Sequence, residues 1–396
     1  MSEIQIVPLY PSELLSKGVD ERMRYFLVEA VVDHPMLTEK LDSLDVLTVF
    51  PTSRNLVLVI GGTGVGKTTL LRKLNDRINN KLSEIAVAAG LVGSVYVELR
   101  TPKKGSFDFS VLHREILVGL GAPLVGRTRP VVMRSAGDMQ IPTLLVERDI
   151  AALRGQALEE RFFRDIRMRS PRAILIDEAA AIFKTARPRG EDDRLERLKT
   201  QADIVKGIAT HAESSVVLGG AYDFFDLSLS SGQNARRSSI IHVEPYSGDE
   251  KGIAGFVVAV TSLLCHLPTV HSIDPVAAAT ELLLQGLGCI GIAAGILAEA
   301  LREAIVTSSP LTIELVRKYY YPKAALDVMR CELEEGRRRV NAFLTLEELL
   351  PAGDGANSST ESFSPSATHR QQGKRRNALK PGDTKPDHMA GATSAW

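Results

Sequence analysis

The sequence has few cysteines, no surplus of charge and no long apolar run, and each shortage removes a class of protein. Its three cysteines, Cys265, Cys289 and Cys331, lie far apart without a C-x-x-C pair. This spacing suggests neither a disulfide framework nor a zinc site and favours a reducing compartment. Forty-eight basic residues balance forty-eight acidic ones. Any contact with DNA must therefore come from a local basic patch rather than from bulk charge.

A membrane or secreted protein is also not indicated. No apolar run reaches the roughly 18 residues that a membrane span needs, and residues 1–11 carry Glu3 and no basic region ahead of an apolar segment. We therefore expect a cytoplasmic protein without membrane contact. The chain does have length, with 396 residues of which 44% are hydrophobic, enough for one large folded unit and a smaller appendage.

Apolar runs alternate with helical patterns through the first two thirds of the chain. The runs cover residues 56–60, 91–99, 173–176, 215–218 and 240–243. This alternation predicts an α/β fold in which helices flank a central parallel sheet. Residues 123–142 are rich in Gly, Pro and Arg, which predicts a surface loop.

The composition changes twice in the C-terminal third. After Gly248 the strand signal stops and helical patterns follow in series, which predicts a small helical lid. Beyond Pro351 the chain turns to Ser, Gly, Thr, Pro and Asn with a basic excess, which predicts a disordered, mildly basic tail. The expected domains are a helical lead-in (1–52), the α/β core (53–247), the lid (248–322), a C-terminal helix (323–350) and the tail (351–396).

A glycine-rich loop follows the first apolar run and precedes a predicted helix. Residues 61–68 match G-x-x-x-x-G-K-[ST], the P-loop pattern, in the strand–loop–helix context that this pattern requires. The residues expected to bind ATP are Gly61, Gly62, Thr63, Gly64, Val65, Gly66, Lys67, Thr68 and Thr69. Backbone N–H groups and the helix N-terminus would hold the phosphates, Lys67 would reach the β and γ phosphates, and the Thr68 hydroxyl would ligate Mg²⁺.

Two acidic residues, Asp177 and Glu178, follow the apolar run at 173–176. A carboxylate after a buried strand is often only a helix cap, but a P-loop upstream favours a hydrolytic pair. Asp177 would then hold Mg²⁺ through water, and Glu178 would polarise the attacking water.

Two further positions are candidates for the γ phosphate. Tyr222 and Asp223 follow the run at 215–218, where a polar side chain could read this phosphate, although a glycine-rich turn with a half-buried tyrosine explains them equally well. Arg236 and Arg237 precede the last run. Either arginine could act as a finger that adds positive charge to a neighbouring subunit's transition state, or both could be surface charge.

The order of these motifs resembles the AAA+ ATPases of DNA transposition, the TniB/TnsC type. The stretch Ile241-His242-Val243-Glu244-Pro245-Tyr246 after the arginine pair is similar as well. Residues 101–108, the turn at 121–124 and the lid stretch 288–291 also sit where that family has comparable residues. The resemblance spans residues 33–322 and leaves out the tail.

The resemblance implies an AAA+ P-loop domain with a lid, in a cytoplasmic protein of bacteria. Such a regulator assembles with ATP as a ring or filament on duplex DNA and, with a target-selector protein, recruits or activates a DDE transposase; hydrolysis disassembles it. Lys103 and Lys104 are then candidates for contacts with DNA phosphates, ahead of Arg127 and Arg129. A lysine pair in a loop is as often plain solvated surface.

One position departs from the family, and other functions stay open. Many AAA+ lids carry an arginine two residues after a glycine at the start of the third lid helix, where this chain has Ala293. A nucleotide-sensing cation in the lid is therefore in doubt. The alternatives are a helicase or motor, a replication initiator or loader, and a signalling ATPase or scaffold without assembly on DNA. Three arginines, Arg337, Arg338 and Arg339, could touch DNA or solvate a helix end.

Overall fold

The computed structural model describes residues 6–30, 32–49, 54–102, 107–121, 131–136, 139–144, 153–183, 191–227 and 238–344. All of these ranges belong to one compact unit, residues 1–346. Lys103, Lys104, Arg127, Arg129, Arg236 and Arg237 lie outside the described residues, as do the tail and the end of the C-terminal helical segment.

The core is a five-stranded parallel sheet with the order β2-β5-β6-β1-β7. Its strands are β1 (Leu56–Gly61), β2 (Ser94–Glu98), β5 (Ala173–Asp177), β6 (Ser215–Gly220) and β7 (Ser238–Val243). Every residue of β1, β5 and β6 is buried, as the continuous apolar runs predict for strands covered on both faces. The fold class expected from the alternating pattern is confirmed.

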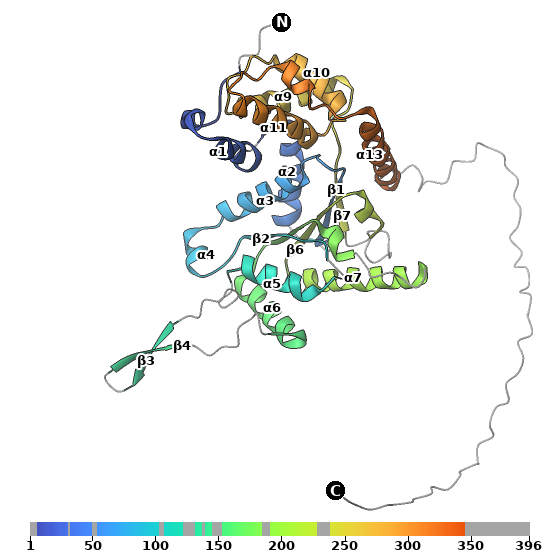
Figure 1. The fold of residues 1–396 in the computed structure, drawn as a ribbon. Coiled ribbons are helices and arrows are strands. Elements are labelled where there is room, and N and C mark those ends of the chain that lie inside the picture. Colours follow the sequence, from blue (N-terminus) through green and yellow to red (C-terminus); the bar gives the residue numbers. More distant parts are fainter. Residues whose placement is uncertain are drawn as a thin grey trace, which may run out of the picture. The chain divides into compact units, whose positions relative to one another are not determined.

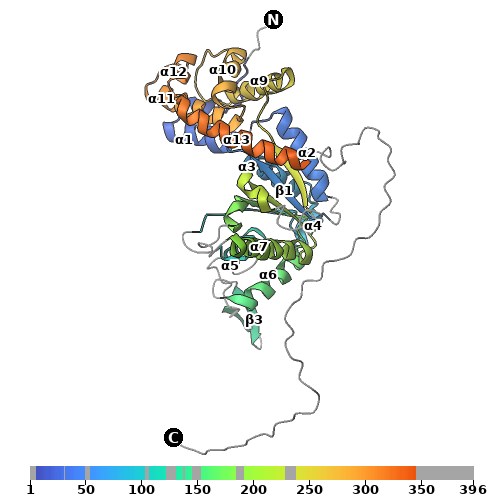
Figure 2. The ribbon, with the colours of Figure 1, turned by 90° about the vertical axis from the view of Figure 1, so that its right-hand side faces the viewer.

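Helices cover both faces of the sheet, with α3 on one side and α5 and α7 on the other (Figures 1 and 2). The helices of the core and of the segment before it are α1 (Val19–Arg24), α2 (Pro35–Val49), α3 (Lys67–Asn80), α4 (Glu84–Ala88), α5 (Phe109–Gly119), α6 (Gly155–Arg169) and α7 (Glu191–His211). Parallel strands bring all their carboxyl ends to one edge, so the loops after β1, β5, β6 and β7 meet there.

Of the five described α-helices that follow β7, four share a hydrophobic core of their own, in the region where a lid is predicted. They are α9 (Glu250–Cys265), α10 (Pro275–Gln285), α11 (Ile290–Val306) and α12 (Ile313–Arg317). Side-chain caps fix their starts: Asp249 accepts from the Gly252 N–H, and Asp274 accepts from the Val276 N–H ahead of a proline at the first helical position. Among the described helices, no single one is long and apolar enough to cross a membrane. Helices α10 and α11 reach the required length and apolar content only when taken together, and they are bent by 113° relative to each other.

The N-terminal segment is divided between the two cores. Phe26 lies in the hydrophobic core of the lid, and the Tyr25 hydroxyl lies 2.9 Å from His266 Nδ1. In contrast, Leu37, Leu41 and Leu44 of α2 lie in the core around the sheet. The lead-in therefore ties the lid to the core instead of forming a layer by itself.

The prediction of a surface loop over residues 123–142 is wrong in part. Two strands, β3 (Val131–Ala136) and β4 (Met139–Leu144), pair antiparallel in this segment. Val131, Val132 and Ile141 are β-branched and favour strand, whereas the prediction weighted the Gly, Pro and Arg residues around them.

Candidate functional site

The P-loop bends between β1 and α3 through two glycines in the left-handed region. Gly64 has φ +79° and Gly66 has φ +101°, values that residues with a Cβ rarely adopt. No acceptor within the described part of the chain takes the N–H groups of Gly64, Gly66 or Lys67. These donors, at the N-terminus of α3, form a site for an anion.

Lys67 lies at the centre of the carboxyl edge. Its Nζ donates to the Gly61 carbonyl at 3.0 Å and to the Gly62 carbonyl at 2.8 Å. Burial lowers the pKa of Lys67, and the charges of Asp177, Glu178 and Asp223 oppose that shift. The structure therefore brings the lysine and the acidic pair together, as the sequence predicts.

Asp177 is held rigidly at the end of β5. Only 2% of it is exposed, and its Oδ1 accepts from the Glu178 N–H at 2.9 Å. Its Oδ2 accepts from the Tyr96 hydroxyl at 3.0 Å. Tyr96 was not predicted as a site residue, although a tyrosine between two valines in β2 was a signal. Gly219 leaves room for this carboxylate, because a Cβ there would lie 3.1 Å from Oδ1.

Glu178 has an unusual backbone. Its φ of +52° places a non-glycine residue in the left-handed region, between β5 and the 3₁₀ helix η4 (Ala179–Phe183). Such a conformation costs about 1–3 kcal/mol and is often found at functional sites. The side chain is exposed beside the buried Asp177, so water can reach it.

Tyr222 and Asp223 point to different partners. The charge of Asp223 acts on Lys67, whereas the buried Tyr222 hydroxyl lies 3.0 Å from His242 Nε2. Burial raises the pKa of Tyr222, and the nearby charge of Arg337 opposes this shift. Asp223 therefore acts on Lys67 through its charge, and Tyr222 packs beside Gly62.

The lid contacts the tip of the P-loop through the N-terminus of α11. The Gly291 N–H donates to the Gly64 carbonyl at 2.7 Å, and a Cβ at position 64 would lie 2.9 Å from Ile292 Cγ1. Cys289 is fully buried at this junction, and burial raises its pKa to about 12. Ala293 is also fully buried, in the lid core.

A second element contacts the P-loop from its other side. Helix α13 (Lys323–Leu344) lies so close that a Cβ at Gly62 would overlap Leu333 Cδ2. Likewise, a Cβ at Gly336 would overlap the Tyr222 ring. Leu333 and Val340 belong to the hydrophobic core around the sheet. From the sequence this helix is expected only as a C-terminal helix after the lid, and its contact with Gly62 is not predicted.

Two arginines of α13 form ion pairs, one with a residue outside the helix and one within it. Arg337 lies 3.4 Å from Glu244, which follows β7, and Arg338 pairs with Glu335 on the same helix at 2.9 Å.

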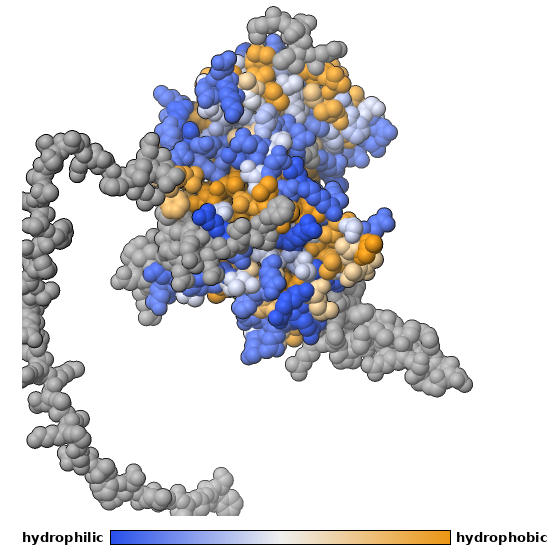
Figure 3. Space-filling view, turned by 180° about the vertical axis from the view of Figure 1, so that it is seen from behind, coloured by the Kyte–Doolittle hydropathy of each residue, from blue (hydrophilic) through white to orange (hydrophobic). Residues whose placement is uncertain are grey.

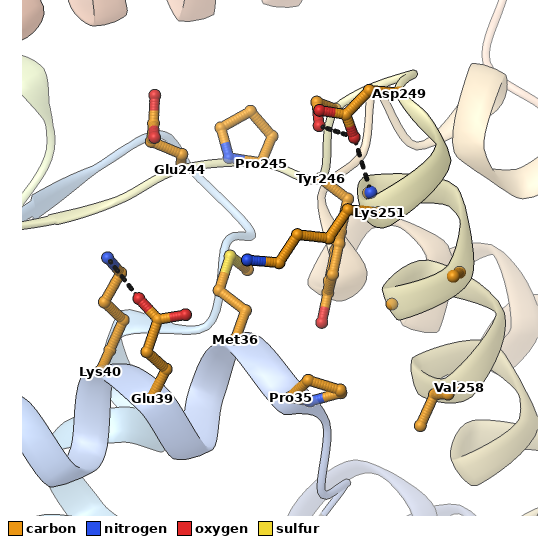
Figure 4. A pocket seen from close by; sticks show the side chains of 14 residues that line it. Pro35, Met36, Glu39, Lys40, Glu244, Pro245, Tyr246, Asp249, Lys251 and Val258 are labelled. Carbon is orange, nitrogen blue, oxygen red and sulfur yellow. Dashed lines mark hydrogen bonds and ion pairs between the residues drawn. The ribbon is translucent and has the colours of Figure 1, made fainter.

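A separate cavity of about 460 Å³ lies where α2, the link after β7 and α9 meet. Its walls include Met36, Glu39, Tyr246 and Lys251 (Figure 4). Tyr246 is in turn held by His34, whose Nδ1 lies 2.7 Å from the Tyr246 hydroxyl. Glu244 lines this cavity and also pairs with Arg337.

The comparisons with known proteins agree with this geometry. Residues 52–227 match the family described as AAA domain. Residues 52–227 have the α/β AAA fold. Domains of this family are P-loop nucleotide-binding units. The strand order of the sheet and the helical region that follows it fit this fold. No curated protein matches the chain.

Solved structures with a similar fold have low sequence identity. The ORC2 protein of Aeropyrum pernix has 14% identity and a TM-score of 0.47, with 75% of this chain and 71% of that chain covered. A Walker-type ATPase of Pyrococcus abyssi has 17% identity and a TM-score of 0.42, with 80% and 79% covered. The RuvB branch migration motor of Thermotoga maritima has 14% identity and a TM-score of 0.35, with 75% and 72% covered. At these values the likenesses carry no information about function.

The residues present fit a nucleotide with Mg²⁺. The loop offers N–H donors and a lysine for phosphates, and Thr68 is the second residue of α3. Among the described residues, no cluster of three or more His, Cys, Asp or Glu could hold a metal ion without help.

Proposed function

We propose that this chain binds ATP with Mg²⁺ at the AAA domain, hydrolyses it, and uses the ATP state to assemble on duplex DNA. The assembly, a ring or filament, would recruit or activate a DDE transposase at a site marked by a target-selector protein. The observation that carries the ATPase part is the position of Lys67 on the P-loop, with Asp177, Glu178 and Asp223 around it.

Each residue of the site has a task in this proposal. The N–H groups of the P-loop and the Lys67 ammonium bind the phosphates. Bound Mg²⁺ would neutralise phosphate charge, with the Thr68 hydroxyl as a ligand and Asp177 bound through water. Tyr96 fixes the Asp177 carboxylate in place. The exposed Glu178 orients and polarises the attacking water.

The assembly part rests on the motif order and on the chemistry of the site. Arg236 or Arg237 of a neighbouring subunit would complete the site with positive charge. Lys103 and Lys104 would contact DNA phosphates, which makes binding salt-dependent and largely independent of base sequence. On the face in Figure 3, apolar residues gather across the middle, a feature typical of interaction surfaces.

Electron microscopy of the full chain with duplex DNA tests this function. We expect rings or filaments on DNA with ATP or a non-hydrolysable analogue, and none with ADP. Lys67→Ala should abolish them, because the phosphates lose their cation. Glu178→Gln should bind ATP and keep the assemblies after ATP is added, because hydrolysis slows.

Several outcomes would contradict the proposal. Free monomers under all nucleotide conditions would favour a signalling ATPase or scaffold. Hydrolysis by Glu178→Gln at the parental rate would remove the role assigned to this carboxylate. Assemblies that form equally with ADP would remove the nucleotide switch.

A further inference from the structure

The lid helix that reaches the P-loop brings no cation to it. The residues of α11 that contact Gly64 are Gly291 and Ile292, and Ala293 is buried. Yet the carboxyl edge carries Asp177, Glu178, Asp223 and Glu244. A bound nucleoside triphosphate adds more negative charge. In a partly buried site, the repulsion between its phosphates and these carboxylates must be offset by cations. Lys67 supplies one.

Helix α13 places a second cation at the same edge. Lys67 Nζ lies 2.8 Å from the Gly62 carbonyl, and Leu333 of α13 packs against that same glycine. One turn later, Gly336 packs on the Tyr222 ring. Arg337 follows directly, so its backbone is fixed next to the start of the P-loop.

The guanidinium of Arg337 has capacity for another partner. Its Nε lies 3.4 Å from Glu244 Oε1, a long contact with a half-exposed carboxylate. Its terminal nitrogens donate to none of the described residues. Burial raises the pKa of Tyr222, which lies beside Gly62, and the positive charge of Arg337 opposes that rise. A guanidinium with two unused nitrogens is well suited to a phosphate, which it binds with parallel hydrogen bonds.

We propose that Arg337 binds the terminal phosphate of ATP within its own subunit, and so takes the part that an arginine at position 293 of the lid would take. The inference rests on the proposed ATP site. On binding, Arg337 exchanges the weak contact with Glu244 for the phosphate, and α13 is held more firmly on the P-loop. With ADP the contact with Glu244 remains. Arg337 therefore distinguishes ATP from ADP and links the nucleotide state to the C-terminal helix.

Equilibrium titration of the full chain with ADP and with a non-hydrolysable ATP analogue, both with Mg²⁺, tests this role. For Arg337→Ala we expect the ratio of analogue affinity to ADP affinity to fall about ten-fold, since a charge-assisted bidentate contact is lost. Arg337→Lys should restore part of the ratio. Arg338→Ala is the matched control, because Arg338 is exposed and pairs only along the helix with Glu335, and its ratio should equal that of the parent.

A second variant separates phosphate binding from a structural role. Glu244→Gln removes the ion pair that Arg337 makes in the structure but keeps the arginine. If Arg337 only anchors α13, Glu244→Gln will lower the ratio as Arg337→Ala does, and the inference is wrong. If Arg337 binds phosphate, the ratio will be kept or will rise. Equal weakening of both nucleotides by Arg337→Ala, or no change, also overturns it. Failure of the parent chain to bind any nucleotide overturns the proposed function itself.

Discussion

The two helices that contact the P-loop differ in what they bring to it. On the side of Gly64, α11 makes a backbone hydrogen bond and an apolar contact through Ile292. On the side of Gly62, α13 brings the flexible side chain of Leu333 and, a turn later, a charged arginine. The α11 side is suited to fix the loop's shape, whereas the α13 side can respond to charge.

A tyrosine–histidine pair also lies near each of these two helices. His34 Nδ1 lies 2.7 Å from the Tyr246 hydroxyl at the entry to the lid, and His242 Nε2 lies 3.0 Å from the Tyr222 hydroxyl beside α13. Burial lowers the pKa of both histidines. For His242 the charge of Glu244 opposes this lowering of the pKa and the charge of Arg337 adds to it, so the α13 pair lies close to the Arg337–Glu244 ion pair.

The largest effect is expected for Gly64→Ala. The left-handed backbone costs about 1–2 kcal/mol for a residue with a Cβ, and the added methyl must displace Ile292 of α11. We expect the free energy of unfolding to fall by about 3 kcal/mol, measured by urea titration, and nucleotide binding to weaken. The control is Gly295→Ala, because Gly295 lies on α11, as Ile292 does, and has open space around it. A fully stable Gly64→Ala would show that α11 does not fix the loop.

The next effect concerns pH on the lid side. Burial, with help from Lys73, lowers the pKa of His34 to about 4 from 6.5, while Asp33 opposes the shift. The unfolded chain therefore takes up the proton first, so this contribution to stability is complete above pH 6.5 and is lost as the pH falls toward 4. Between pH 7 and pH 5 the loss is about 2 kcal/mol. His34→Gln should remove that part of the pH dependence in urea titrations, and an unchanged pH dependence would contradict the assignment.

The smallest effect is expected on the α13 side, for Gly62→Ala. The one overlap of the new methyl is with the end of the flexible Leu333 side chain, while Tyr222 lies at ordinary contact distance, so the helix can adjust at a cost of about 1 kcal/mol. Adding Leu333→Ala should relieve the overlap, so that the double variant is less destabilised than the sum of the two single changes. Additive losses in thermal unfolding would mean that these two residues do not contact each other.

Much of the site could be predicted from short stretches of sequence. The P-loop requires glycines, a lysine and a threonine at fixed spacing after an apolar strand, and Asp177 and Glu178 follow another such strand. These signals are local, and a parallel sheet must bring the carboxyl ends of its strands to one edge. Their meeting at Lys67 therefore followed from the pattern alone.

Other features depended on contacts between distant parts of the chain. Tyr96 on Asp177, the N-terminal segment on the lid, and α13 on Gly62 each join residues that no local pattern connects. Helical periodicity predicted a C-terminal helix at 323–350 but could not say which surface this helix covers, because many apolar surfaces satisfy the same pattern. The sequence by itself determined the phosphate-binding chemistry, and only the tertiary structure decided that Arg337 would lie beside it, since packing selects one partner among many of similar hydrophobicity.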